Sequence, residues 1–224
     1  MRYRRVAIYH VPSGAFHSAG SSWLGWDNRA GRALDQPMGS VGKTIKPQKY
    51  GFHATIKAPF RLNDGCHIDT LITATQSLCA SLSAVDIGTL RLKRIGGFLA
   101  IVPQSSSEEL LHMAQTLVTK LDTFRSPLTQ DDIARRRKSR LSARQDALML
   151  DWGYPYVLEQ FKYHMTLTDR LSDQALVESE TDAAQHFAKF LTTPYSIHSV
   201  SLCAEDHDGR FHVVKTFDLS GPRM

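Results

Sequence analysis

Two short segments carry the residue types that acid–base chemistry requires. His53-Ala54-Thr55-Ile56 and His164-Met165-Thr166-Leu167 each place an imidazole two positions before a hydroxyl. An unperturbed histidine titrates near pH ~6.5, so two of them can hold one neutral base and one protonated acid at neutral pH. Threonine hydroxyls can donate to non-bridging oxygens where negative charge develops. The pairs therefore fit acid–base cleavage of a phosphoester.

The strand context of the two pairs matters more than their number. Ten His and 16 Thr in 224 residues would give about 0.7 His-x-Thr matches by chance. Side chains alternate between the faces of a strand, and both 50–60 and 161–168 alternate apolar with polar residues. For either segment alone, a solvated polar face with Thr favoured by its β propensity is the simpler interpretation. Two strands with the same polar order, and a lysine beside each histidine, favour one shared site.

Composition predicts an ordinary globular protein. The chain has 224 residues, 42% hydrophobic and 22% charged, which suits one sizeable domain or two lobes around a cleft. The N-terminus has no secretory apolar core, and no apolar run approaches the ~20 residues of a membrane span. The three cysteines, Cys66, Cys79 and Cys203, have no CxxC spacing, so we expect reduced packing residues. We expect a cytoplasmic monomer with no membrane partner.

An excess of basic residues lies in one run. The net charge of +5 favours an anionic ligand without identifying it. Residues 135–140 are mostly arginine and lysine, and Arg136, Arg140 and Arg144 would share one face of a continuous helix. A solvated helix face is the simpler interpretation. The alternatives are a phosphate-binding stripe beside the cleft and a nucleic-acid patch, although no aromatic residues interleave with the arginines.

Residue patterns predict alternating strands and helices. The expected strands are 5–11, 50–60, 87–103 as a hairpin turning at Gly96-Gly97, 161–168, 196–205 and 211–219, the last two joined at Asp206-His207-Asp208-Gly209. The expected helices are a short one near 22–34 within the loop 13–49, then 69–84, 107–124 with Ser106 or Ser107 as cap, a basic helical segment 127–156, and 172–191.

The order of these elements repeats. Each histidine strand is followed by a helix and then by two strands, which predicts an α+β protein built as a two-lobed, pseudo-symmetric repeat. Two antiparallel sheets would face each other across a central cleft, with helices on the outside. We expect a single domain spanning 1–224, with a first lobe at 13–124, a basic helical insertion at 125–156 and a second lobe at 157–224. The N-terminal strand within 1–12 would pair in the second lobe.

Other catalytic arrangements have less support in the sequence. His53 and His164 lack the neighbouring ligands of a metal site such as HExxH. His198, His207 and His212 could gather with Asp206 and Asp208 near the last turn, but exposed turn and strand positions explain them more simply. No GxSxG nucleophile motif and no Walker loop occurs. We therefore expect no metal and no cofactor.

The segments that hold the motifs resemble a known superfamily. Residues 49–60 and 161–168, together with Arg135-Arg136-Arg137, the 152–156 segment Trp-Gly-Tyr-Pro-Tyr and the N-terminal strand, resemble two-histidine phosphoesterases. They are most similar to a subgroup encoded beside phosphonate-utilisation genes. The resemblance covers nearly the whole chain. It implies metal-independent phosphoesterase chemistry with His53, Thr55, His164 and Thr166 as the four motif residues.

The sequence therefore predicts an enzyme that hydrolyses a cyclic phosphodiester on a sugar or nucleotide. His53 and His164 would be catalytic, while Thr55 and Thr166 would bind the phosphate. Tyr9 would stack on a base or sugar, and Lys57 and Arg144 would contact phosphate. A phosphonate context would suggest a cyclic ribose phosphate or another small phosphoester. The alternatives are an RNA-binding protein that uses the same basic cleft without turnover, and a metal-dependent hydrolase.

Overall fold

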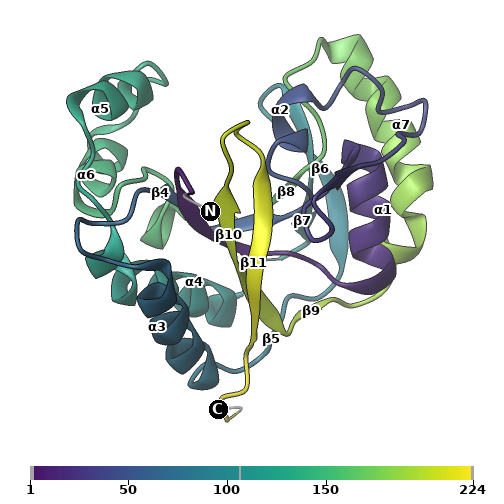
Figure 1. Cartoon of the computed structure of the whole chain (residues 1–224). Coiled ribbons are helices and arrows are strands. Elements are labelled where there is room, and N and C mark those ends of the chain that lie inside the picture. Colours follow the sequence, from purple (N-terminus) through teal and green to yellow (C-terminus); the bar gives the residue numbers. More distant parts are fainter. Residues whose placement is uncertain (1–2, 106, 223–224) are drawn as a thin grey trace.

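Strands and helices are interspersed along the chain (Figure 1), and the computed structural model describes residues 3–105 and 107–222. The first half contains β1 (Val6–His10), α1 (Gly14–Leu24), β2 (Trp26–Asp27), β3 (Arg32–Ala33), α2 (Ile45–Gln48), β4 (Ala54–Phe60), α3 (Ile68–Ala80), β5 (Val85–Asp86), β6 (Leu90–Ile95), β7 (Phe98–Pro103) and α4 (Glu108–Lys120). The second half contains α5 (Gln130–Arg137), α6 (Ala143–Trp152), β8 (Met165–Thr166), α7 (Asp173–Leu191), β9 (Ser196–Ile197), β10 (Ser199–Glu205) and β11 (Phe211–Asp218), with short 3₁₀ turns at Asp122–Phe124 and Leu158–Gln160.

Seven strands form one antiparallel sheet in the order β11-β10-β1-β4-β8-β7-β6. The expected α+β class with antiparallel strands is confirmed. The two halves of the sheet are not separate, however, because β4 pairs with β8 at Ala54 and Met165. This short ladder lies between the four-stranded and three-stranded halves. It therefore brings the two histidine segments into direct contact at the middle of the molecule.

The predicted repeat of element order is present. Each hairpin, however, pairs with a strand from the other half of the chain. Each histidine segment is followed by a helix, a short strand and a hairpin, and the two short strands β5 and β9 pair with each other. The first hairpin, β6–β7, pairs with β8. The second hairpin, β10–β11, reaches β4 through β1, so the N-terminal strand does pair with the C-terminal hairpin. Each half of the sheet thus combines both halves of the chain.

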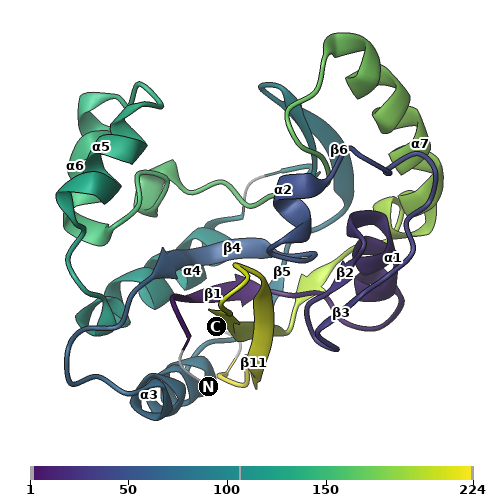
Figure 2. The same cartoon turned by 45° about the horizontal axis from the view of Figure 1, so that its top comes forward.

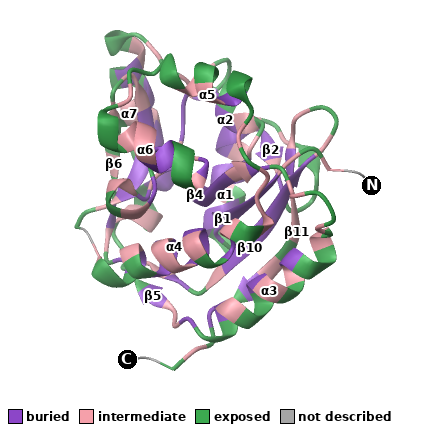
Figure 3. Ribbon diagram, turned by 90° about the vertical axis from the view of Figure 1, so that its left-hand side faces the viewer, coloured by how far each residue is buried: buried purple, intermediate pink, exposed green. Residues whose placement is uncertain are grey.

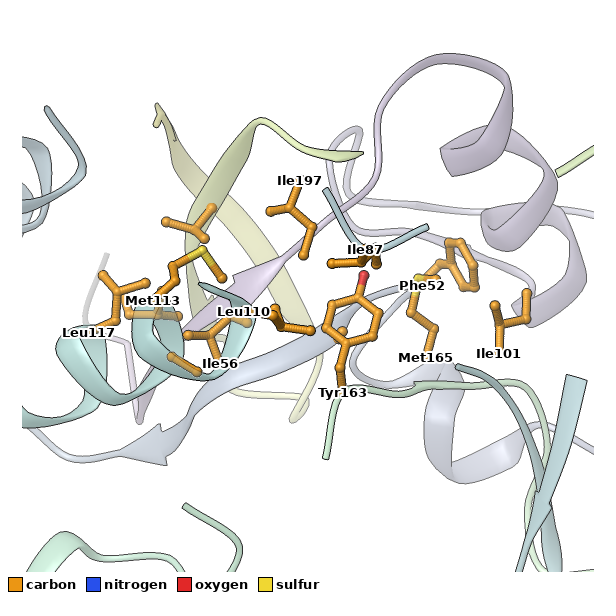
Figure 4. Packing of buried hydrophobic residues seen from close by; sticks show 14 of the residues in the cluster. Phe52, Ile56, Ile87, Ile101, Leu110, Met113, Leu117, Tyr163, Met165 and Ile197 are labelled. Atoms are coloured by element: carbon orange, nitrogen blue, oxygen red, sulfur yellow. The ribbon is translucent and has the colours of Figure 1, made fainter. Parts of the chain in front are cut away.

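One hydrophobic cluster extends beneath the motif strands, and helices cover it. Its members come from strands throughout the sheet and from α1, α3, α4 and α7, and the buried strands contrast with the exposed outer faces of the helices (Figure 3). Figure 4 shows Ile56 of β4 and Met165 of β8 in this cluster, with Phe52 and Tyr163 nearby. Because strand side chains alternate, burial of these residues directs the intervening His and Thr to the opposite face.

Several element boundaries differ from the expected ones. The first helix spans Gly14–Leu24 instead of lying near 22–34, and it ends at Gly25, whose φ of 76° is left-handed. The helix packs closely on Phe52, which precedes β4, since a Cβ on Gly20 would lie 2.0 Å from the Phe52 ring. Both histidine strands are shorter than expected, so His53 and His164 each lie immediately before a strand. No helix of the described residues has the length and apolarity needed to cross a membrane.

His10 makes the stability of the fold depend on pH. The side chain is 3% exposed, and burial lowers its pKa to about 4. Its Nδ1–H donates to the Ser199 carbonyl at 3.0 Å, and its Nε2 accepts from the Tyr195 hydroxyl at 2.9 Å. Between pH ~6.5 and 4 the unfolded chain binds a proton here that the folded chain does not. This contribution to stability is therefore complete above pH ~6.5 and is lost as the pH falls towards 4.

We expect urea unfolding of the wild type to show a loss of about 3 kcal/mol from this group between pH 7.5 and 4. The His10→Gln variant, which cannot titrate, should have a shallower pH dependence in the same window. Burial also lowers the pKa of His53, so a residual slope of the same sign should remain. Equal slopes for the two proteins would contradict this role of His10.

Candidate active site

The β4–β8 ladder brings the four motif residues together on one face of the sheet. Ala54 lies opposite Met165, and the antiparallel register, continued by one residue in each direction, places His53 opposite Thr166 and Thr55 opposite His164. Residues directly opposite in such a pair have Cβ atoms roughly 4.5–5.5 Å apart. All four side chains are half-buried. Each histidine therefore faces the threonine of the other motif.

Both imidazole rings are held by the same local hydrogen bond. The Nδ1–H of His53 donates to the carbonyl of Gly51 at 2.8 Å, and the Nδ1–H of His164 donates to the carbonyl of Lys162 at 2.8 Å. A carbonyl can only accept, so Nδ1 carries the hydrogen in each ring and the neutral tautomer leaves Nε2 as the basic nitrogen. Nε2 of His53 lies 3.2 Å from the Thr55 hydroxyl. In both rings Nε2 is therefore the nitrogen that can accept or donate a proton during a reaction.

An aromatic wall surrounds His53. The ring of Tyr9 lies 3.9 Å from the His53 ring, centroid to centroid, and Tyr50 lies 5.9 Å away. Phe211 of β11 stacks on Tyr50 at 5.1 Å. The pKa of His53 is lowered to about 4, mainly by burial and to a smaller extent by the charge of His164, while the hydrogen bond to Gly51 partly opposes both effects. His53 is consequently neutral at pH 7 and lies within electrostatic reach of His164.

His164 has a different environment from His53. Phe98 is its aromatic neighbour, with the ring centroids 6.1 Å apart, and the adjacent Lys162 is exposed. The two motifs are therefore similar in sequence, but different residues surround their histidines. Tyr50, Phe98 and Phe211 were not predicted as site residues, because their proximity to the histidines depends on pairings between distant segments.

Tyr9 occupies a different position from the one expected. Val6 and Ile8 belong to the main core, whereas Tyr9 packs with Phe211 on the other face of the strand. However, Tyr9 is 0% exposed. Its ring supports the His53 imidazole and is not accessible for stacking on a base or sugar.

Lys57 is also withdrawn from the motif residues. Its Nζ donates to the Val118 carbonyl at 3.0 Å and forms an ion pair with Asp122 at 2.7 Å. Asp122 also pairs with Arg125. A bulge in the β1–β4 pairing falls between Thr55 and Lys57, which disrupts the simple alternation of faces. Lys57 is therefore a structural cation at the end of α4, and Val118 and Asp122 hold its ammonium group away from the motif residues.

The continuous arginine stripe is not present. The basic segment forms two short helices, because α5 ends at Arg137, Arg140 has a left-handed φ of 52°, and Ser142 starts α6 with a capping box. Arg144 is exposed and pairs with Glu159, so it does not reach the motif residues. The guanidinium carbon of Arg136 lies 5.0 Å from the centre of the Tyr154 ring.

Metal-ligand clusters and disulfides are not found among the residues that the structure describes. No group of three or more His, Cys, Asp or Glu side chains there could hold a metal ion. His212 pairs with Asp206 at 2.7 Å. The three cysteines are free thiols, two of them buried.

A family model for "Protein of unknown function (DUF1045)" matches residues 55–212 of the chain. The chain belongs to the DUF1045 family. Two curated relatives of this DUF1045 protein are named "Ribose 1,5-bisphosphate phosphokinase PhnN". One, from Janthinobacterium sp. (strain Marseille), is 35% identical over 92% of the chain and 48% of the relative. The other, from Laribacter hongkongensis (strain HLHK9), is 31% identical over 92% of the chain and 49% of the relative. The chain spans about half the length of these relatives.

Solved structures with similarity to the chain are found at low sequence identity. A structure titled as E. coli LigT complexed with phosphate aligns with 98% of the DUF1045 chain and 99% of its own chain, at 10% identity and a TM-score of 0.48. Another, titled as a phosphoesterase, aligns with 96% of this chain and 98% of its own, at 9% identity and a TM-score of 0.46.

Proposed function

We propose that this protein is a metal-independent phosphoesterase that hydrolyses a cyclic phosphodiester on a sugar or nucleotide. The observation that carries the proposal is the β4–β8 register, which brings His53, Thr55, His164 and Thr166 together on one sheet face. The shared tautomer of the two rings supports it. In the resting site Nε2 of His53 accepts from the Thr55 hydroxyl, and a bound phosphoester would take over that donor. Two histidines and two hydroxyl donors can then together supply a base, an acid and stabilisation of the phosphoryl oxygens.

The different surroundings of the histidines suggest their roles. His53, neutral because of its burial, accepts a proton from the attacking water at Nε2. The new P–O bond forms as the ring P–O bond breaks, and His164, which enters this step as the imidazolium with a hydrogen on each ring nitrogen, donates its Nε2 proton to the departing oxygen. The Thr55 and Thr166 hydroxyls donate to the non-bridging oxygens. A bound phosphoester anion raises the basicity of His53 during this step, because a nearby negative charge favours the imidazolium.

The names of the relatives support a phosphorylated sugar as the substrate class without supporting kinase activity in this chain. Gly42-Lys43-Thr44 resembles the end of a phosphate-binding loop, but Pro37 stands where that loop requires its first glycine. The backbone N–H groups of Ile45 and Lys46 donate to the Asp169 carboxylate at 2.8 and 3.0 Å. An anionic side chain therefore already occupies the donors that a nucleotide phosphate would use.

The direct test is an activity assay after metal removal. Wild-type protein treated with chelator should hydrolyse at least one member of a panel containing 2′,3′-cyclic nucleotides and cyclic ribose phosphates, with kcat unchanged relative to untreated protein. Loss of activity in chelator and its recovery with zinc would support a metal-dependent hydrolase instead. Salt-dependent RNA binding without hydrolysis, unaffected by His53→Ala, would support the non-catalytic alternative.

A further inference from the structure

A basic cavity of about 580 Å³ adjoins the proposed active site. It lies between the C-terminal part of β4, the start of β1 and the helices α5 and α6, which stand beside β4 in Figure 2. Tyr50 lines the cavity and is also part of the aromatic wall around His53. The cavity contains neither motif histidine. It is therefore a neighbouring compartment that shares a wall with the reacting site.

The cavity follows the strand that carries the first motif. Lys57, two residues after Thr55, is the first β4 residue in its lining, and the lining continues to Arg61. A strand advances about 3.3 Å per residue, so the cavity begins roughly 7 Å from Thr55 and extends well beyond it. A ligand with two anionic groups separated by a sugar ring can span that distance. One group would lie between the histidines and the other in the cavity.

Positive charge exceeds negative charge in the cavity lining. Seven arginine and lysine side chains line it against two carboxylates, Asp132 and Glu205. Two of the seven, Lys57 and Arg125, share a third carboxylate, Asp122, which lies outside the lining. Glu205 forms two hydrogen bonds with Arg5, both of 2.6 Å, and Asp132 pairs with Arg61 and Arg135. These ion pairs fix the positions of three guanidinium groups, and the lining still has a net positive charge. Such a surface attracts an anion.

Arg136 is the lining residue best suited to bind that anion. Within the described part of the chain it forms no ion pair, and its buried Nε has no hydrogen-bond partner. The guanidinium is held against the Tyr154 ring. Burial lowers the pKa of Arg136; Tyr154 and Asp132 act against this shift, and the charges of Arg135 and Arg5 act in the same direction as burial. A guanidinium that has no ion-pair partner and is surrounded by like charges is stabilised strongly by a bound phosphate. The phosphate oxygens can accept two parallel hydrogen bonds from its N–H groups.

We propose that this cavity binds a phosphomonoester of the substrate, with Arg136 as its principal ligand. The inference rests on the proposed function and narrows its substrate to a cyclic phosphodiester that carries a second phosphate. A phosphate is a better match than a carboxylate, because its dianion suits the net positive lining and its three terminal oxygens can engage more than one guanidinium. Arg136 would then determine specificity and would not take part in proton transfer.

The test compares two substrates that differ only in the second phosphate. The probes are adenosine 2′,3′-cyclic phosphate and the same nucleotide with a 5′-phosphate. The wild type should have a kcat/KM about 10- to 100-fold higher for the 5′-phosphorylated probe, the range expected for a charged hydrogen-bonded contact. Arg136→Ala should reduce this preference towards one, and Arg136→Lys should restore only part of it.

Lys138→Ala is the matched control. It removes a charge from the exposed C-terminal end of the same helix, outside the cavity lining, and should retain the wild-type preference. Melting curves for each variant exclude loss of folding. A wild type without preference, or an Arg136→Ala variant with wild-type preference, would overturn the inference and leave the proposed hydrolysis intact.

If the wild type hydrolyses neither probe, the proposed function fails for them and calorimetry tests the cavity separately. Ribose 5-phosphate should bind the wild type and Lys138→Ala equally, and should bind Arg136→Ala at least about tenfold more weakly. Equal affinity for Arg136→Ala and the wild type would overturn the inference. Absence of binding to the wild type would overturn it as well.

Discussion

Replacing either His53 or His164 by alanine is expected to lower kcat about 10²- to 10⁴-fold on a cyclic phosphodiester that the wild type hydrolyses. Each substitution removes one of the two proton transfers, while the β4–β8 ladder and both threonines remain. The double variant should lose little more than the more severe single variant, because the two groups act in one step. Single-turnover rates would measure these losses without interference from product release.

His112→Ala is a suitable control for the histidine variants. His112 is exposed on α4 and has no role in the proposed site, so this variant should retain the wild-type kcat. The His53→Ala variant should also lose less stability than the wild type when the pH is lowered, since the pKa of His53 lies below that of an exposed histidine. Wild-type activity in either motif variant would contradict the acid–base mechanism.

The substitution Asp122→Ala should destabilise the protein by about 3 kcal/mol. Asp122 balances the ammonium group of Lys57, whose side chain is 4% exposed, and it also pairs with Arg125 at 2.8 Å. Burial lowers the pKa of Lys57, and Asp122 opposes that shift. Without the carboxylate, the buried ammonium retains only the Val118 carbonyl. Urea unfolding at pH 7 would measure the loss.

A companion variant separates the buried charge from other effects of the substitution. Lys57→Met removes the ammonium and leaves Asp122 paired with Arg125, so we expect a loss of only ~1 kcal/mol. The double variant should then be more stable than Asp122→Ala alone, because it contains no unpaired ammonium at this position. Strictly additive losses would show that Lys57 and Asp122 do not depend on each other.

The parts of the site that depend on local sequence could be predicted. Strand alternation places Ile56 and Met165 in the core, and this directs His53, Thr55, His164 and Thr166 to the opposite face without knowledge of the strand partners. The strand-helix-hairpin order likewise depends on local patterns. The break between α5 and α6 was not predicted, although Ser142 and Gln145 have the residue types and spacing of the capping box that begins α6.

Long-range pairings account for what could not be predicted. Phe211 and Tyr50 join the wall around His53 only because β11 packs near residues 49–50, where the Phe211 N–H donates to the Lys49 carbonyl at 2.7 Å. Lys57 follows the expected spacing, but α4 supplies the carbonyl and the carboxylate that bind it. The joining of the two halves into one sheet depends on a ladder of few residues, which has no sequence signal of its own.

The central claim is that the two motifs form one phosphate site. The most direct test is a crystal of the protein soaked with inorganic phosphate. We expect a phosphate ion within hydrogen-bond distance of Nε2 of both His53 and His164 and of the hydroxyls of Thr55 and Thr166. A second ion beside Arg136 would agree with the proposed subsite. A phosphate ion in contact with only one motif, or bound in the arginine cavity alone, would contradict the account.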